Sequence, residues 1–105
     1  MLMTIKKSEA IKFLDSLIVE KESFGGFLQA IREADKISQT RFSKKLRISK
    51  QHLCDIEKGR KLVSPERAAK FSKTLGYSEK SFVALALQDS MRNGGLHYKV
   101  ELKVA

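Results

Sequence analysis

Residues 39–58, QTRFSKKLRISKQHLCDIEK, hold two short helical patterns separated by a tight turn, and they decide the fold of this chain. The apolar spacing predicts one helix over about 39–46 and a second over about 50–57. Each helix has one apolar side, and an apolar residue in the turn closes the core between them. The side chains expected to face inward are Phe42, Leu46, Ile48, Leu53 and Ile56.

The opposite side of the second helix is polar and basic. A short helix that is anchored on one side and free on the other fits the major groove of double-stranded DNA, where amide and cationic side chains bond the base edges. This stretch therefore predicts a helix-turn-helix that binds DNA. The side chains on the free face are Lys50, Gln51, Cys54, Asp55 and Lys58.

Further helices are predicted on both sides of this pair, and a serine precedes most of them as a candidate cap. The run Ser-Pro-Glu at 64–66 is a strong helix start, because it combines a cap, a proline at the first helical position and an acid in the first turn. The expected helices cover about 8–21, 24–36, 65–75 and 79–93. The expected caps are Ser23, Ser38, Ser49, Ser64 and Ser78, and the aromatic core is Phe24, Phe27, Phe42, Phe71 and Phe82.

The period changes near the C-terminal end, where apolar and polar residues alternate from 96 to 104. Strict alternation predicts a β-strand, and a lone strand leaves a row of backbone groups unpaired. We therefore expect two copies to pair these strands antiparallel in a homodimer, which places Glu101 near a lysine of the mate. The apolar positions, expected to cover the last helices, are Leu96, Tyr98, Val100, Leu102 and Val104.

Charge is concentrated in one third of the chain. The 105 residues carry 21 Lys and Arg against 12 Asp and Glu, a net charge of +9. Residues 38–75 hold eleven basic and three acidic side chains, so nearly all of the excess lies there. Clustered positive charge indicates a polyanionic partner, whereas solubility alone needs only scattered charge.

Several function classes are disfavoured by the composition. The length suits one small domain, and no run approaches the roughly 20 apolar residues of a membrane span. With Cys54 as the single cysteine, no internal disulfide and no cysteine-based metal site can form. His52 and Cys54 diverge on a helix, so they cannot chelate one metal ion. We expect no enzyme, no cofactor, no metal and no membrane partner, and a cytoplasmic location.

Residues 24–78, from FGGFLQAIREADK to KTLGYS, resemble the lambda-repressor-like family of helix-turn-helix domains, also called Cro/C1-type or XRE. The matching parts are Ser38-Gln39, Ile48-Ser49, Leu53, Ile56-Glu57, Gly59-Arg60, Ser64-Pro65 and Leu75-Gly76. Two positions depart, since the family usually has alanine where Ser43 stands and glycine where Arg47 stands. A positive φ at Arg47 costs ~1 kcal/mol for a residue with a Cβ.

The resemblance implies an all-α, five-helix DNA-binding domain, here with an extra N-terminal helix and the dimerisation strand. It also implies a structural ion pair between Arg32 and Glu57. The residues it assigns to base readout are Ser49, Lys50, Gln51, Cys54 and Asp55. Those it assigns to phosphate contacts are Gln39, Arg41, Lys44, Arg47, Lys58, Arg60 and Lys61.

The organisation expected is an N-terminal helical extension at 1–22, the helix-turn-helix domain at 23–78 and a last helix plus strand at 79–105, together one compact unit. The function implied is a sequence-specific transcriptional regulator, a dimeric repressor of a palindromic operator in the bacterial cytoplasm, associated with the nucleoid when bound. One alternative is an antitoxin that regulates its own operon and binds a toxin protein. A second is a protein–protein adaptor that kept the fold without reading DNA.

Overall fold

A computed structural model describes residues 23–105, which form five helices. The predicted helix over 8–21 and the predicted extension over 1–22 lie outside the described residues. The two central helices have the predicted bounds, which confirms the helix-turn-helix pattern. The helices are α2 (Phe24–Ala34), α3 (Gln39–Leu46), α4 (Lys50–Glu57), α5 (Pro65–Leu75) and α6 (Glu79–Asn93).

A serine caps the N-terminus of every one of these five helices. In each case the serine has extended backbone, and its Oγ accepts a hydrogen bond from the backbone N–H three residues later. That bond satisfies one of the amide groups which the first turn leaves without a helical partner. The caps are the five predicted ones, Ser23, Ser38, Ser49, Ser64 and Ser78.

Helix α2 ends two residues before the predicted boundary. It stops at Ala34, and the chain then turns through Lys36, whose φ of 55° is left-handed and therefore cannot continue a helix. The guanidinium of Arg32 bonds the Ile37 carbonyl at 3.0 Å just beyond this turn. The boundary is thus set by the connection to α3, which local helical periodicity does not encode.

The core is aromatic, as the sequence predicts. Phe82 lies at its centre, with the rings of Phe24 and Phe27 edge-on to it at centroid distances of 5.6 Å. Tyr77 stacks on the same ring at 5.9 Å. Tilted and edge-to-face pairs of this kind add to the burial of apolar area that stabilises a small domain. The expected phenylalanines Phe24, Phe27, Phe42, Phe71 and Phe82 are all buried.

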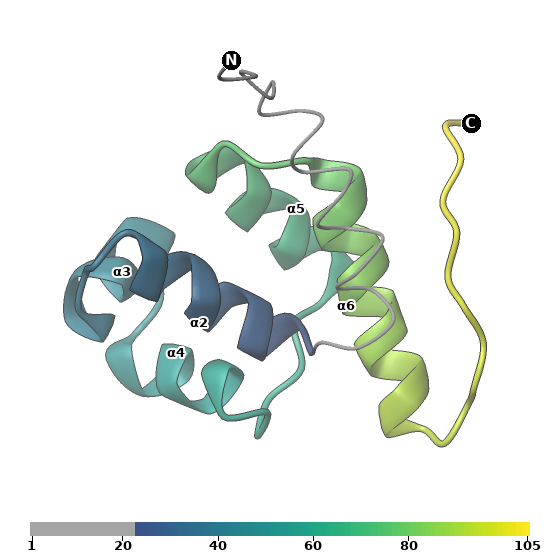
Figure 1. Cartoon of the computed structure of the whole chain (residues 1–105), viewed down its shortest axis with the longest axis horizontal. Helices are drawn as coiled ribbons and strands as arrows, with labels where there is room; N and C mark the ends of the chain where they lie inside the picture. The colour runs from purple at the N-terminus through teal and green to yellow at the C-terminus, as the bar shows by residue number, and fades with distance from the viewer. Residues whose placement is uncertain (1–22) are drawn as a thin grey trace, which may run out of the picture.

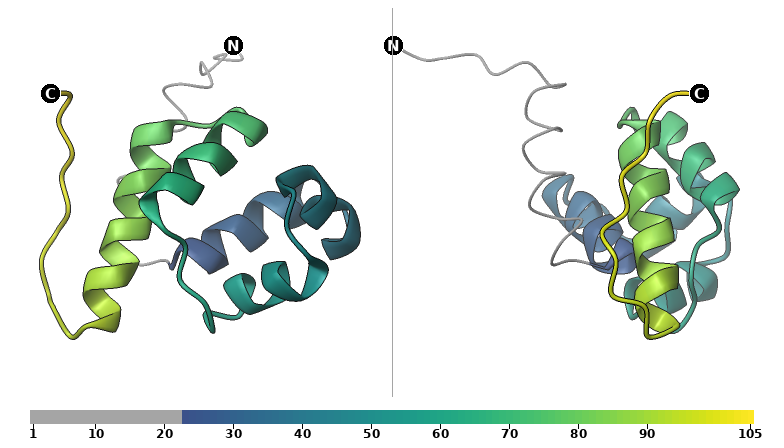
Figure 2. Two further views of the ribbon diagram at one scale, coloured as in Figure 1. Left: turned by 180° about the vertical axis from the view of Figure 1, so that it is seen from behind. Right: turned by 90° about the vertical axis from the view of Figure 1, so that its right-hand side faces the viewer.

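Helix α2 lies in the middle of the molecule and joins its two sides. It contacts α4 on one side and α6 on the other, while α5 and α6 pack side by side (Figures 1 and 2). The helix-turn-helix pair α3 and α4 therefore lies at the opposite side of the fold from α6. None of the helices in residues 23–105 is long and apolar enough to cross a membrane.

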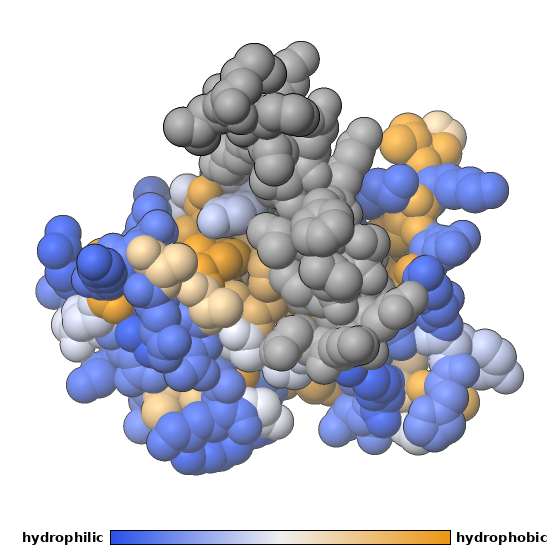
Figure 3. Space-filling model, viewed as in Figure 1, coloured by the Kyte–Doolittle hydropathy of each residue, from blue (hydrophilic) through white to orange (hydrophobic). Residues whose placement is uncertain are grey.

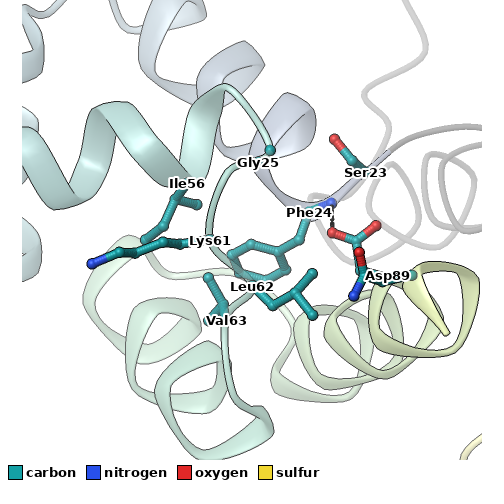
Figure 4. A pocket seen from close by; sticks show the side chains of 10 residues that line it. Ser23, Phe24, Gly25, Ile56, Lys61, Leu62, Val63 and Asp89 are labelled. Carbon is teal, nitrogen blue, oxygen red and sulfur yellow. Dashed lines mark hydrogen bonds between the residues drawn. The ribbon is translucent and has the colours of Figure 1, made fainter.

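The start of α2 is tied directly to α6. The Asp89 carboxylate accepts a hydrogen bond of 2.9 Å from the Phe24 N–H, beside a small hollow between α2, the loop after α4 and α6 (Figure 4). A carboxylate at a helix N-terminus also interacts favourably with the helix dipole. This contact helps to hold α2, and with it α4, in place. The other lining residues are Ser23, Gly25, Ile56, Gly59, Lys61, Leu62, Val63 and Asn93.

The predicted C-terminal strand does not form within the described part of the chain. Residues 96–105 run as an extended segment along the outside of α6, without a β ladder (Figures 1 and 2). A ladder needs a second strand, and residues 23–95 contain none. The cover of the last helices by all five apolar side chains was expected for the paired dimer, and it stays a prediction. Val100 and Leu102 are half-buried, whereas Leu96, Tyr98 and Val104 are 50%, 68% and 94% exposed.

Candidate nucleic-acid interface

Helix α4 is anchored on one side and presents its other side to solvent. Leu53 and Ile56 are buried in the core, and Ile48 from the preceding turn packs against it. This arrangement leaves the first turn of the helix outermost, with its side chains available to a partner. Of the five side chains predicted to read bases, Ser49, Lys50 and Gln51 are exposed, and Cys54 and Asp55 are half-buried.

A small hydrogen-bond network orders the exposed face of α4. The Asp55 carboxylate accepts from the Gln51 carboxamide at 3.1 Å and from the Arg60 guanidinium at 3.3 Å, both at Oδ1. In the absence of DNA, Asp55 orients two neighbours that carry donors, and its contact with a base stays a prediction. Because Gln51 donates with one Nε2 hydrogen only, its second hydrogen and its Oε1 remain usable for an adenine edge.

Arg32 and Glu57 lie in the ion pair that the family resemblance implied. Arg32 Nε is 2.8 Å from Glu57 Oε2, and Nη2 is 3.0 Å from Oε1, so the pair is bidentate. The hydrogen bond to Glu57 raises the pKa of Arg32, although its partial burial acts in the opposite direction. Gln39 Nε2 also donates to Glu57 Oε1 at 2.9 Å. The network therefore joins α2, α3 and α4 through one buried carboxylate.

Six of the seven residues predicted to contact phosphates are exposed basic side chains. Gln39 differs, because its carboxamide is half-buried and bonded inward to Glu57. Its Nε2 group carries a second hydrogen that this bond leaves unused. Hydrophilic residues predominate on the side of the molecule where α3 and α4 lie (Figure 3, left). The six are Arg41, Lys44, Arg47, Lys58, Arg60 and Lys61.

Sequence reasoning missed Arg67 as a neighbour of α4. Its Nη1 lies 3.1 Å from Nδ1 of His52, so a cation from the first turn of α5 reaches the side of α4. Partial burial, followed by the nearby charge of Arg67, lowers the pKa of His52. The lowered pKa favours the neutral form of His52. No local pattern signals this contact, because it joins two residues that lie 15 positions apart in the chain, on different helices.

The turn between α3 and α4 is left-handed at Arg47. Its φ of 59° and ψ of 41° lie where glycine is usual, as the sequence comparison with the family anticipates. The left-handed residue lets its own N–H bond back to the last turn of α3, at 3.1 Å from the Lys44 carbonyl. The turn geometry therefore survives the departure from glycine, with some backbone strain.

We expect Arg47→Gly to stabilise the domain by about 0.5–1 kcal/mol, because the left-handed conformation costs glycine no steric energy. Chemical denaturation of the variant and the parent protein measures the difference. Lys36→Gly is a matched comparison, since Lys36 has a φ of 55° in the other left-handed turn. A loss of stability in Arg47→Gly would show that its side chain has contacts which outweigh the strain.

Within residues 23–105, no group of three or more His, Cys, Asp or Glu side chains is placed to hold a metal ion.

Comparison with known proteins is consistent with the geometry of α3 and α4. The helix-turn-helix family model matches residues 28–82, which run from α2 into α6 and include α3 and α4 completely. No curated protein and no solved structure matches the chain. The chain belongs to the Cro/C1-type, XRE-like family of helix-turn-helix DNA-binding domains.

Proposed function

We propose that this protein is a sequence-specific transcriptional regulator that acts as a dimeric repressor and reads a palindromic operator through α4. The observation that carries the proposal is that one side of α4 is buried in the core and the other side is exposed to solvent. Leu53 and Ile56 fix the helix in the core, while Lys50 and Gln51 extend from its exposed first turn. A rigid helix that presents an ammonium and a carboxamide suits guanine and adenine edges in the major groove.

The surrounding charges support the same proposal. Exposed cations follow α4 directly at Lys58, Arg60 and Lys61, and others lie on α3 and in the turn. Cations beside a base-reading helix neutralise phosphates and set the position of the helix in the groove. A single module of this size covers about half of an operator, so two copies related by a two-fold axis match a palindrome.

The test is a selection of bound sequences from a random duplex pool, followed by titration of the selected duplex and a scrambled one at near-physiological salt. We expect a preference of about 10³-fold or more for the selected duplex. Lys50→Ala and Gln51→Ala each lose about ten- to a hundredfold in affinity for that duplex and little for the scrambled one. Lys80→Ala is the control, because it removes an equal exposed charge from α6.

Two further outcomes decide between base readout and charge alone. Equal, weak and steeply salt-dependent binding to both duplexes would contradict the proposal, because it reports phosphate contacts without base contacts. Arg47→Gly separates backbone strain from phosphate contact. We expect it to lose affinity for both duplexes while it gains stability, whereas Lys36→Gly gains stability alone.

A further inference from the structure

Asp55 places a carboxylate on the face of α4 that is proposed to meet DNA. Residues 38–75 hold three acidic side chains, and the other two have clear structural roles. Glu57 pairs with Arg32 in the core, and Glu66 lies in the first turn of α5, where an acid suits the helix dipole. A carboxylate beside a polyanion lowers affinity, because like charges repel. The presence of Asp55 on this face therefore needs a separate explanation.

The loop after α4 holds Asp55 in place through both its side chain and its main chain. The side chain is 16% exposed, and its Oδ1 lies 3.3 Å from Nη1 of Arg60. The backbone carbonyl of Asp55 accepts from the N–H groups of Arg60 at 2.8 Å and of Lys61 at 3.2 Å. These contacts fix the position of the carboxylate. They also place a cation beside it, which reduces its repulsion of phosphates.

The same carboxylate oxygen accepts a hydrogen bond from Gln51, one helical turn earlier. Nε2 of Gln51 lies 3.1 Å from Oδ1 of Asp55. A carboxylate accepts hydrogen bonds but does not donate them, so the carboxamide must turn its nitrogen toward Asp55 and its oxygen away. The reversed carboxamide would bring two acceptors together. A protein–DNA groove has a lower dielectric than water, which strengthens such a preference. Asp55 thus selects one of the two orientations of the Gln51 carboxamide.

This orientation decides which hydrogen bonds Gln51 can offer to a base. Because Asp55 uses one Nε2 hydrogen, the carboxamide retains one donor and one acceptor oxygen. Adenine presents one acceptor, N7, and one donor, the N6 amino group, in the major groove. Guanine presents two acceptors, N7 and O6, so one of them would face the carboxamide oxygen. A carboxamide held by Asp55 therefore matches adenine, whereas one that is not held can donate both hydrogens to guanine.

We propose that Asp55 is a positioning residue that makes Gln51 selective for adenine over guanine at one position of the operator. The inference rests on the DNA readout proposed above and adds the base that Gln51 prefers. Asp55 acts through Gln51, which replaces the direct base contact that the family resemblance implies. Its charge lowers the affinity for any DNA, and its hydrogen bond to Gln51 raises the discrimination between bases. A residue that only supported the loop would leave that discrimination unchanged.

Titration of single-base variants of the selected duplex tests this role. The position read by Gln51 is the one where Gln51→Ala abolishes the base preference. We expect the parent protein to bind adenine there about tenfold or more tightly than guanine. Asp55→Ala should reduce that ratio to about threefold or less, while the affinity for the scrambled duplex rises about two- to fivefold because a negative charge is removed. Glu79→Ala removes an equal charge from α6 and should leave the ratio unchanged.

A double-variant cycle shows whether Asp55 acts through Gln51. In a Gln51→Ala background, Asp55→Ala should change the preference at every position by less than about twofold. A larger change would show that Asp55 bonds a base itself, and it would overturn the positioning role. Circular dichroism checks that each variant keeps its helices. If Asp55→Ala loses them, Asp55→Asn keeps the size of the side chain, and the ratio should fall in the same direction because an amide can also donate.

The remaining outcomes separate this inference from the proposed function. A preference for guanine, no position read by Gln51, or a ratio unaffected by Asp55→Ala would overturn the inference alone. A fall in affinity for both duplexes at an unchanged ratio would do the same, because it means that Asp55 only supports the loop. A parent protein without any sequence preference would overturn the proposed DNA readout, and this inference with it.

Discussion

Gly25→Ala should destabilise the domain by about 3 kcal/mol or more, which is a large part of the stability of a chain this small. A Cβ built on Gly25 would lie 1.8 Å from the backbone oxygen of Ile56 and 2.8 Å from its carbonyl carbon. Both are backbone atoms of α4, so no side-chain rotation can relieve the overlap. To make room, α2 and α4 must move apart, and this opens the core around Phe24 and Leu28. Urea denaturation followed by circular dichroism measures the loss.

Gly94→Ala is the matched control for this prediction. Its Cβ would have its nearest neighbour at 3.6 Å, the Met91 carbonyl oxygen, which is an ordinary contact. The φ of −85° at Gly94 suits an alanine, so we expect a change within about 0.5 kcal/mol. If Gly25→Ala were as stable as Gly94→Ala, the close approach of α2 and α4 would not hold in solution.

The contrast between these two glycines shows what local sequence rules predict and what they miss. Serine caps and the bounds of α3 and α4 follow from local rules, and the structure confirms them. The need for glycine at position 25 follows instead from an approach to a residue 31 positions away. Likewise, the alternation at 96–104 predicts a strand correctly only if a second strand exists, and residues 23–95 contain none. Contacts between distant elements are the part that sequence periodicity does not encode.

In the candidate site, too, some features follow from local sequence rules and others depend on contacts between distant residues. Exposure of Lys50 and Gln51 follows from helical periodicity once Leu53 and Ile56 face inward. The Arg32–Glu57 ion pair was expected only because the chain resembles a known family, since nothing in its spacing indicates it. The inward bond of Gln39 and the contact of Arg67 with His52 were not expected. Long flexible side chains reach several partners, and the tertiary arrangement decides among them.

Arg32→Met should lower the free energy of unfolding by about 3–5 kcal/mol at neutral pH. The side chains of Arg32 and Glu57 are 14% and 2% exposed. Methionine keeps most of the apolar stem of arginine and removes the guanidinium. The Glu57 carboxylate then stays buried and keeps, of its present side-chain hydrogen bonds, the one from Gln39. The Ile37 carbonyl loses the hydrogen bond that Arg32 donates. Denaturation of this variant beside the parent protein measures the cost.

Two comparisons identify the cause of that loss. Arg60→Met also removes a guanidinium, here from an ion pair with Asp55. Because the Arg60 side chain is 55% exposed, we expect the free energy of unfolding to fall by less than about 1 kcal/mol. The double variant Arg32→Met with Glu57→Leu removes both charges and should recover much of the stability lost in the single variant. A double variant no more stable than Arg32→Met would mean that the cost comes from lost packing. Recovery would mean that the loss comes from leaving the buried Glu57 carboxylate without a cation. Arg32 would then hold α4 in place by neutralising Glu57, the last residue of that helix.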